Sequence, residues 1–151
     1  MYQNGHLDEV ARVFVSAFSA PPLNYGFVNT ESAKKYILEI TRTPGFLGYV
    51  FIEQGSICAF SLGAVDNNFK GAMYQLKEFA VDAKLHRSGV GSEAMRLLEG
   101  KMAGLGIDAI SLSTSRRLPA FSFYKKNGYI EIEENVSLVK WVSEDRKEMV
   151  E

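Results

Sequence analysis

Apolar side chains recur at helical spacing in four stretches of the chain. The spacing predicts helices at about residues 7–18, 30–41, 90–104 and 119–128. Asp8 and Glu9 fall in the first turn of the first stretch, where acidic side chains favour a helix N-terminus. Pro119 suits the first turn of the last helix and Gly128 suits its C-cap. All four stretches therefore read as amphipathic helices with one buried face.

Shorter apolar stretches between these helices are typical of strands. They lie at about residues 46–53, 56–65, 73–81, 107–113, 129–133 and 136–142. The turn at Gln54-Gly55 and the polar turn at 66–71 are short, which predicts that the first three strands are consecutive and antiparallel. The last two strands are predicted to form a hairpin around Glu134-Asn135. The order of elements predicts an α/β protein of the α+β type, with one mixed sheet and helices on both faces.

Composition narrows the class of protein. The 151 residues suffice for one domain, predicted at residues 1–142 and followed by a charged tail at 143–151. The net charge of −1, from 17 basic and 18 acidic residues, gives no general attraction to nucleic acid or to an anionic membrane. We find no stretch of the roughly 20 apolar residues that span a bilayer and no signal-peptide pattern, so we expect a cytoplasmic protein with no nucleic-acid or membrane partner.

Candidate metal and thiol chemistry is sparse. There is no Cys/His cluster and no acidic loop with metal-ligand spacing, so no metal site is predicted. The single cysteine, Cys58, lies among Ile57, Ala59 and Phe60, which is typical of a packed strand position. A catalytic thiol would need one of the two histidines nearby, and we expect Cys58 to be structural.

The segment from Asp82 to Ser92 has the pattern of an anion-binding loop. It connects a predicted strand to a predicted helix and carries Gly89 and Gly91 where the chain turns. Glycines let the backbone approach a ligand closely, and the amides of the first helical turn point toward it. Phosphate oxygens suit both the amides and the positive end of the helix dipole. Arg87 would add a fixed charge. Glycine pairs also occur in ordinary turns, so this loop alone does not decide the function.

Two motifs together resemble the GNAT N-acetyltransferase superfamily. His86-Arg87-Ser88-Gly89-Val90-Gly91 is similar to the acyl-CoA signature of the family, with both glycines in place and His86 where the family usually has Gln or Arg. About thirty residues later, Phe123-Tyr124 followed by Gly128-Tyr129 is similar to the end of the late helix of the family. The order of elements also resembles the GNAT fold over about residues 7–142. The family fold begins with a strand, whereas only Met1 to His6 precede the first predicted helix.

The resemblance implies an acetyl-CoA site. In the GNAT fold the sheet splays between the family's fourth and fifth strands, here after the strand ending at Val81, and the pantetheine arm fills the gap. Main-chain groups of Phe79, Ala80 and Val81 would then bond that arm. The loop residues His86, Arg87, Ser88, Gly89, Val90, Gly91 and Ser92 would hold the phosphates. The alternative for His86 is an exposed loop residue without a role in binding.

The resemblance also implies two catalytic residues. Tyr124 matches a family tyrosine that protonates the departing thiolate, and a phenol with an ordinary pKa near 10 still carries its proton at neutral pH. The alternative is a tyrosine that only packs on the sheet. Glu78 lies on the key strand and is the candidate general base, the alternatives being a water chain or an ion pair with a surface lysine. Simple alternation puts Leu76, Glu78 and Ala80 on one face of the strand, and the alternative is that irregular pairing at the splayed strand reorients Glu78.

The acceptor site is expected in the loop between the first two helices. Leu23, Asn24, Tyr25 and Phe27 lie there, with Asn24 and Tyr25 as the candidate substrate-binding residues. Their aromatic rings would suit an apolar or ring-bearing acceptor, or would merely pack the loop onto the core. The family resemblance leads us to expect an acetyl-CoA-dependent N-acetyltransferase acting on a small-molecule or peptide amine. The alternative is an acyl-CoA-binding module without catalysis.

Two further expectations remain. A nucleotide site in the glycine loop is disfavoured, because the loop lacks both the Lys-Ser/Thr ending of a P-loop and the three-glycine dinucleotide pattern. Many relatives dimerise through their late strands, and Leu138, Val139 and Trp141 offer apolar side chains for such a contact. A core position for Trp141 is the alternative reading.

Overall fold

A computed structural model of the chain describes residues 1–26, 28–69 and 71–145. The helices are α1 (Leu7–Ser19), α2 (Thr30–Thr41), α3 (Val90–Gly104) and α4 (Pro119–Lys126), with short 3-10 turns η1 (Asn4–His6) and η2 (Ala83–Leu85). The strands are β1 (Phe46–Glu53), β2 (Ser56–Asn68), β3 (Gly71–Val81) and β4 (Ala109–Ser111). All four predicted helices are confirmed, and β1, β2 and β3 lie where the sequence predicted consecutive strands.

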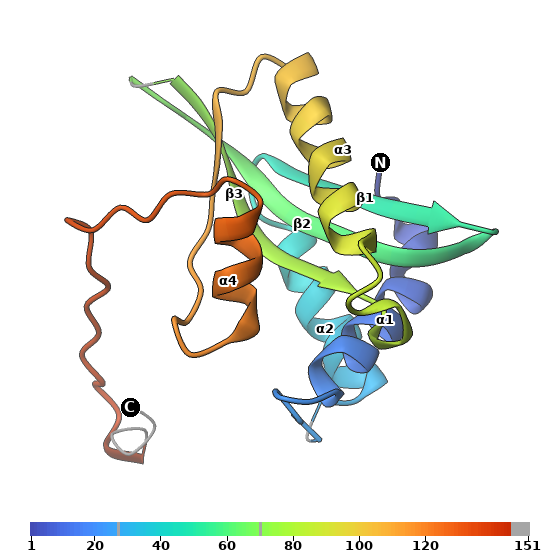
Figure 1. Cartoon of the computed structure of the whole chain (residues 1–151). Coiled ribbons are helices and arrows are strands. Elements are labelled where there is room, and N and C mark those ends of the chain that lie inside the picture. Colours follow the sequence, from blue (N-terminus) through green and yellow to red (C-terminus); the bar gives the residue numbers. More distant parts are fainter. Residues whose placement is uncertain (27, 70, 146–151) are drawn as a thin grey trace.

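The four strands form one mixed sheet in the order β1-β2-β3-β4. The first three are antiparallel, and β4 is parallel to β3, so a crossover connection containing α3 links them. In Figure 1, α1 and α2 cover one face of the sheet, and α3 and α4 cover the other. This arrangement confirms the predicted α/β fold with helices on both faces.

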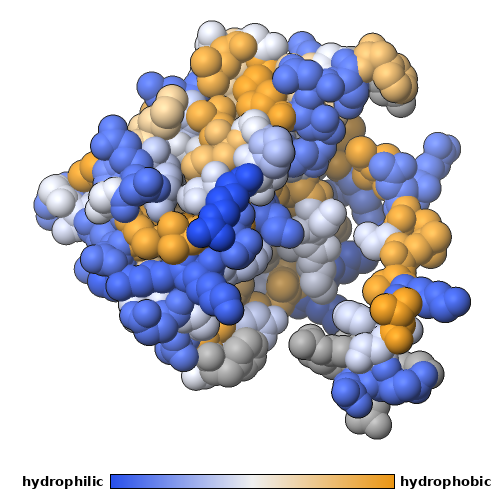
Figure 2. Space-filling model, turned by 180° about the vertical axis from the view of Figure 1, so that it is seen from behind, coloured by the Kyte–Doolittle hydropathy of each residue, from blue (hydrophilic) through white to orange (hydrophobic). Residues whose placement is uncertain are grey.

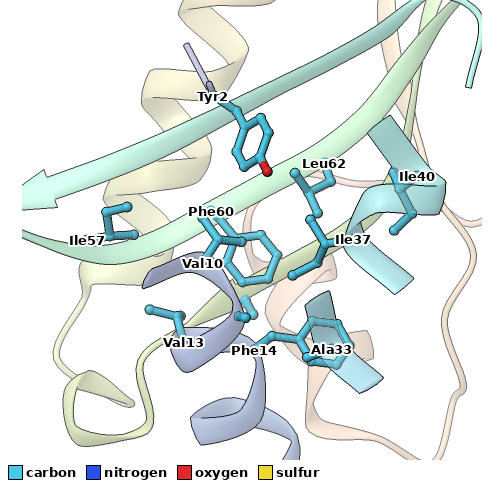
Figure 3. Packing of buried hydrophobic residues seen from close by; sticks show 12 residues of the cluster. Tyr2, Val10, Val13, Phe14, Ala33, Ile37, Ile40, Ile57, Phe60 and Leu62 are labelled. Atoms are coloured by element: carbon cyan, nitrogen blue, oxygen red, sulfur yellow. The ribbon is translucent and has the colours of Figure 1, made fainter. Parts of the chain in front are cut away.

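Each face of the sheet has its own apolar core. On one face, Val10 and Phe14 of α1 and Ile37 of α2 pack against Phe60 and Leu62 of β2 (Figure 3). On the other face, the core consists of Tyr49, Tyr74, Leu76, Met95, Leu98 and Met102, which come from β1, β3 and α3. The two cores hold both helical layers against the sheet, so that β3 lies between the layer of α1 and α2 and the layer of α3 and α4.

The N-terminal segment lies against β1 through both the main chain and the side chain of Tyr2. The amide of Tyr2 donates to the carbonyl of Gly48 in β1 at 2.8 Å. The ring of Tyr2 is buried and meets Phe46 edge-on. No strand precedes α1 in the described part of the chain.

The prediction of a C-terminal hairpin at 129–142 is wrong. Residues 130–142 form no strand in the structure, and the segment extends away from the main body (Figure 1). The predicted strand at 107–113 is also shorter, since only Ala109–Ser111 pair with β3. Alternating apolar residues predict strand propensity, but a strand also needs to pair with another strand, and residues 130–142 pair with none of the four described strands. The predicted tail at 143–151 lies mostly outside the described residues.

Candidate functional site

The sheet opens between β3 and β4. These strands pair only at Met73–Ala109, Tyr74–Ile110 and Gln75–Ser111, while β3 continues to Val81. The far half of β3 therefore has no neighbour on the edge where β4 would continue. The parallel pairing ends partway along β3, and we call the unpaired stretch of this edge, from Leu76 to Val81, the gap between β3 and β4.

Only alternate residues of β3 direct their main-chain groups into this gap. The amide of Asp82 donates to the carbonyl of Cys58 in β2 at 2.9 Å, and hydrogen-bonding direction alternates along a strand. The N–H and C=O groups of Ala80 therefore face β2, whereas those of Phe79 and Val81 face the gap. Of the three residues predicted to bond pantetheine, Ala80 is committed to the sheet. Phe79 has both main-chain groups on the gap side, and Val81 has its amide there, because its carbonyl accepts from Nε2 of His86.

A β-bulge in β3 decides where Glu78 points. Leu62 pairs with Glu78 and Gly63 with Leu76, so Lys77 is the extra residue. Leu76 packs in the core beneath α3, whereas Ala80 packs beneath α1 and α2. The predicted alternation is therefore wrong: the bulge reverses the faces and puts Leu76 opposite Glu78 and Ala80.

Glu78 lies under α2, where Tyr36 contacts it. The hydroxyl of Tyr36 donates to Oε1 of Glu78 at 2.7 Å. Burial raises the pKa of Glu78 above its ordinary value, even though the Tyr36 hydrogen bond and the charge of Lys77 act in the opposite direction. A partly buried carboxylate with a raised pKa is a better proton acceptor than an exposed one, which suits a general base.

Tyr124 approaches the same site from α4. This helix ends in a Schellman motif, in which the amide of Tyr129 donates to the carbonyl of Tyr124 at 3.0 Å and Gly128 adopts φ +91°. Burial, and next the negative charge of Glu78, raise the pKa of Tyr124 to about 12. The phenol therefore stays protonated at neutral pH and is available as a proton donor. The rings of Phe123 and Tyr129 pack edge-on against it.

The predicted anion-binding loop forms the N-terminus of α3, just beyond the end of β3. Arg87 and Gly89 both have positive φ angles, of 65° and 87°, which turn the chain sharply into the helix. Among the described residues, no side chain caps this helix, so the first amides of α3 are left for a ligand. A Cβ at Gly89 would meet no atom within 4 Å, which means that open space faces this position.

Gly91 has a different role from Gly89. A Cβ built on Gly91 would lie 3.1 Å from Cε1 of Phe123 and 3.5 Å from Cγ2 of Val81. The absence of a side chain there lets α3 pack closely against α4 and the end of β3. Gly91 therefore brings the helix N-terminus toward the gap, and Phe123 of the Tyr124 helix is the residue that it accommodates.

His86 and Asp82 anchor the loop rather than extend from it. Nε2 of His86 donates to the carbonyl of Val81 at 2.8 Å, so this ring nitrogen contacts the strand. The buried carboxylate of Asp82 accepts from Arg12 Nη1 at 2.9 Å and from the Ser16 hydroxyl at 3.1 Å. That hydroxyl in turn accepts from the amide of Ala83 at 3.0 Å. Residues of α1 thus hold the turn from which the loop starts.

A pocket of about 240 Å³ lies between α1 and α2, and we name it the α1–α2 pocket. Its lining consists of Phe14, Val28, Ser32, Ala33 and Tyr36. Figure 3 shows Phe14 of α1 and Ala33 of α2 beside each other. Tyr36 is both a wall of this pocket and the hydrogen-bond partner of Glu78, and it therefore links the pocket to that carboxylate.

The predicted acceptor loop leads into this pocket, but Asn24 and Tyr25 are not among the residues that line it. The Tyr25 ring stacks on Phe18 of α1 at 6.1 Å, and Asn24 is exposed with φ 50°. Leu23 is half-buried, and Phe27 lies outside the described residues. Tyr25 therefore packs the loop onto α1, which was the alternative to a role in acceptor binding. The pocket walls come mainly from the two helices. Phe14 and Tyr36 could not be selected from the sequence, because each has an ordinary place in a helical apolar pattern.

Other candidate sites are limited in the described part of the chain. Cys58 is buried, its thiol donates to the carbonyl of Phe51, and burial raises its pKa, all of which make it an unreactive thiol. No group of three His, Cys, Asp or Glu residues among those described is arranged to hold a metal ion. No helix in the described ranges is long and apolar enough to cross a membrane.

The structure combines a mixed sheet that opens between β3 and β4 with a helix that begins at two glycines beside the opening. This is the fold that the two sequence motifs imply. The model of the acetyltransferase (GNAT) family matches residues 9–129, which is most of the chain. The chain belongs to the GNAT acetyltransferase family. Members of this family use acetyl-CoA as the acetyl donor. A search of curated protein sequences gives no match.

Solved structures show the same fold at low sequence identity. A GNAT family acetyltransferase from Staphylococcus aureus superimposes with a TM-score of 0.68 and 16% identity, covering 93% of this chain and 95% of that one. The aminoglycoside acetyltransferase meta-AAC0020 from an uncultured soil sample has a TM-score of 0.66 and 15% identity, with 89% and 87% coverage. Glucosamine-6-phosphate N-acetyltransferase from Arabidopsis thaliana superimposes with a TM-score of 0.55 and 19% identity, covering 77% of this chain and 80% of that one.

Proposed function

We propose that this protein is an acetyl-CoA-dependent N-acetyltransferase that transfers the acetyl group to a primary amine by direct attack on the thioester. The observation that carries the proposal is the gap between β3 and β4, with the uncapped N-terminus of α3 at its end and with Glu78 and Tyr124 on its two sides. We expect the reaction in the cytoplasm, as predicted from the sequence.

The residues of the gap fit acetyl-CoA. The amides of Phe79 and Val81 and the carbonyl of Phe79 face the gap and suit the hydrogen bonds that the amide groups of pantetheine require, whereas the carbonyl of Val81 already accepts from His86. The amides from Gly89 to Ser92, together with the helix dipole, suit the pyrophosphate. Arg87 is exposed beside them and adds a positive charge. When bound there, acetyl-CoA supplies an activated acyl group on a sulfur.

Three groups of the chain then act on the reaction. Glu78 takes the proton from the acceptor ammonium, because its raised pKa brings it closer to that of an amine. The amide of Phe79 or Val81 donates a hydrogen bond to the thioester oxygen, where negative charge develops. Tyr124 donates its proton to the sulfur as the carbon–sulfur bond breaks, and its high pKa ensures that the proton is present.

A charge test at Gly89 addresses the phosphate site. We expect Gly89→Asp to weaken acetyl-CoA binding about tenfold or more, because a carboxylate would compete with the pyrophosphate for the same amides. Gly89→Asn is the matched control: it has the same shape, tolerates a positive φ equally and carries no charge. Calorimetric titration with acetyl-CoA and with free CoA measures both variants, and equal loss in the two would contradict the phosphate assignment.

A thiol-release assay run beside this titration separates catalysis from binding alone. Acetyl-CoA binding followed by thiol release with an amine supports the transferase. Binding without thiol release for any amine would point instead to an acyl-CoA-binding module. No binding by the wild-type protein would refute the proposed function.

We also propose a homodimer that uses the extended segment 130–142, which we name the C-terminal arm. Ile130, Leu138 and Val142 of the arm are each more than 85% exposed. Figure 2 shows the arm standing apart from the main body, with apolar and polar residues along its length. Isolated apolar residues on a surface are ordinary, but a whole extended segment of them is better explained by a second chain.

A further inference from the structure

We infer that the acceptor is a compact amine whose apolar group, such as a single ring, occupies the α1–α2 pocket while its amino group meets Glu78. This inference rests on the proposed function and names its substrate class. It is drawn from the walls of the pocket, the state of its polar atoms and its position relative to the catalytic carboxylate.

The pocket walls are almost wholly apolar. Phe14, Val28 and Ala33 contribute only carbon atoms from their side chains, and the ring of Tyr36 meets that of Phe14 edge-on at 5.8 Å. Burying an apolar group against such walls is favourable in proportion to the area removed from water. The walls therefore favour a carbon-rich group over a hydroxylated one.

The polar atoms of the lining side chains already have partners. The Ser32 hydroxyl accepts from the amide of Asn29 at 3.1 Å and donates to its carbonyl at 3.0 Å, as part of the cap of α2. The Tyr36 hydroxyl donates a hydrogen bond to Glu78. A sugar-like acceptor would bring several hydroxyl groups into the pocket with few groups left to receive them. Each unpaired buried hydroxyl disfavours binding.

The size of the pocket suits one ring. Its volume is about 240 Å³, and an apolar cavity of about 150 Å³ already accommodates benzene. An aromatic ring with a short alkyl chain therefore fits. An acceptor made of several linked rings would extend well beyond the described walls.

The carboxylate behind the Tyr36 wall of the pocket suits a single amino group. Glu78 is the carboxylate that Tyr36 links to the pocket, and no acidic residue is among the described residues that line it. One carboxylate matches one ammonium group. A polycationic acceptor would need several, so this pocket differs in chemistry from what the substrate of the soil aminoglycoside acetyltransferase, a fold relative at 15% identity, would require.

The test compares three amines on the full chain. Acetyl-CoA binding is measured first by calorimetry, and its absence would refute the proposed function rather than the acceptor class. With binding established, we expect kcat/KM for phenethylamine to exceed that for glucosamine about a hundredfold, because the sugar hydroxyls lack partners. Equal or better use of glucosamine overturns the inference, and so does a lack of turnover of phenethylamine.

A pocket-filling variant locates the effect. Val28→Phe should lower kcat/KM for phenethylamine about tenfold while leaving ethylamine, which has no ring, nearly unchanged. Leu105→Phe is the control, since it enlarges an exposed apolar residue after α3 by a similar amount. Equal losses for both amines overturn the inference. Ala33→Val narrows the same pocket and replaces Val28→Phe if thermal melting shows that the latter does not fold.

Direct binding gives a readout that does not depend on catalysis. Saturation-transfer NMR of phenethylamine with the wild-type protein should show the strongest transfer at the ring protons, because the ring is the part enclosed by protein. Val28→Phe should reduce that signal and Leu105→Phe should not. Transfer of equal strength in all three proteins contradicts the assigned pocket.

Discussion

At the scale of single residues, the proposed chemistry depends on how burial tunes two ordinary side chains. Glu78 and Tyr124 would titrate far from each other in water. Burial is the largest cause of a raised pKa for both. The raised pKa keeps the proton on Tyr124, and it makes the Glu78 carboxylate a stronger proton acceptor where that group is ionised. Tyr36 is a third participant, because its hydroxyl sets the environment of Glu78.

Replacing Tyr124 by Phe should lower kcat about a hundredfold, which is the usual size of a general-acid contribution. The affinity for acetyl-CoA should stay nearly unchanged, because the hydroxyl acts on the sulfur only as the bond breaks. Steady-state kinetics and calorimetry measure the two quantities. Unchanged turnover would eliminate Tyr124 as the proton donor and leave it as a packing residue.

Replacing Tyr36 by Phe should shift the acidic limb of the pH–rate profile to higher pH. The Tyr36 hydroxyl stabilises the charged form of Glu78, so its removal raises the carboxyl pKa further. Activity requires the deprotonated form and is lost as the pH falls through that pKa. In Glu78→Gln this limb should vanish with most of the activity. A profile that Tyr36→Phe does not move would indicate that another group, such as a water chain, serves as the base.

At the scale of elements, the site results from three local departures from regular structure. The bulge at Lys77 turns Glu78 toward α2, the early end of β4 opens the gap, and the positive φ of Gly89 starts α3 beside it. The contacts of Asp82 with Arg12 and Ser16 tie the turn between β3 and α3 to α1. These contacts are both structural and functional, because the loop they hold carries the proposed phosphate site.

Asp82→Asn should destabilise the protein by about 1–2 kcal/mol at neutral pH, since charge-assisted hydrogen bonds of a buried carboxylate are lost. Burial acts to raise the pKa of Asp82, but the hydrogen bonds from Arg12, Lys84 and Ser16 outweigh it and leave the pKa lowered.

A lowered carboxyl pKa stabilises the fold above the pKa of the unfolded chain, which is about 3.9, and this contribution is lost as the pH falls through the folded value. Urea unfolding of Asp82→Asn and wild type between neutral and acidic pH should therefore give curves that converge below about pH 4. A constant difference across this range would contradict the assigned role of the charge.

At the scale of the whole molecule, the sheet is completed differently from the expected fold. The described body has four strands, and the residues predicted as the last hairpin form the C-terminal arm instead. Among the described residues, the outer edge of β4 has no strand beside it. An open strand edge and an extended apolar segment in one molecule are complementary, and two copies would satisfy both.

Leu138→Asp should convert the proposed dimer to a monomer, because it places a charge at a contact that would be apolar between chains. Leu138 is 91% exposed in the single chain, so the same change should leave the melting temperature of a monomer nearly unaltered. Light scattering during size exclusion measures the mass of both proteins. Lys140→Asp alters the charge of an exposed neighbour and serves as control, and a monomeric wild-type protein would remove the proposal.

The sequence by itself determined the four helices, the first three strands and the family, because apolar periodicity and glycine positions are local properties of the chain. It could not place Glu78, since a bulge arises from the pairing of β3 with β2, and it could not find Tyr36, which looks like any apolar helix residue. It overestimated the late strands, because a strand needs a partner edge as well as propensity. Only the tertiary structure decided these features, since each depends on which distant segments lie side by side.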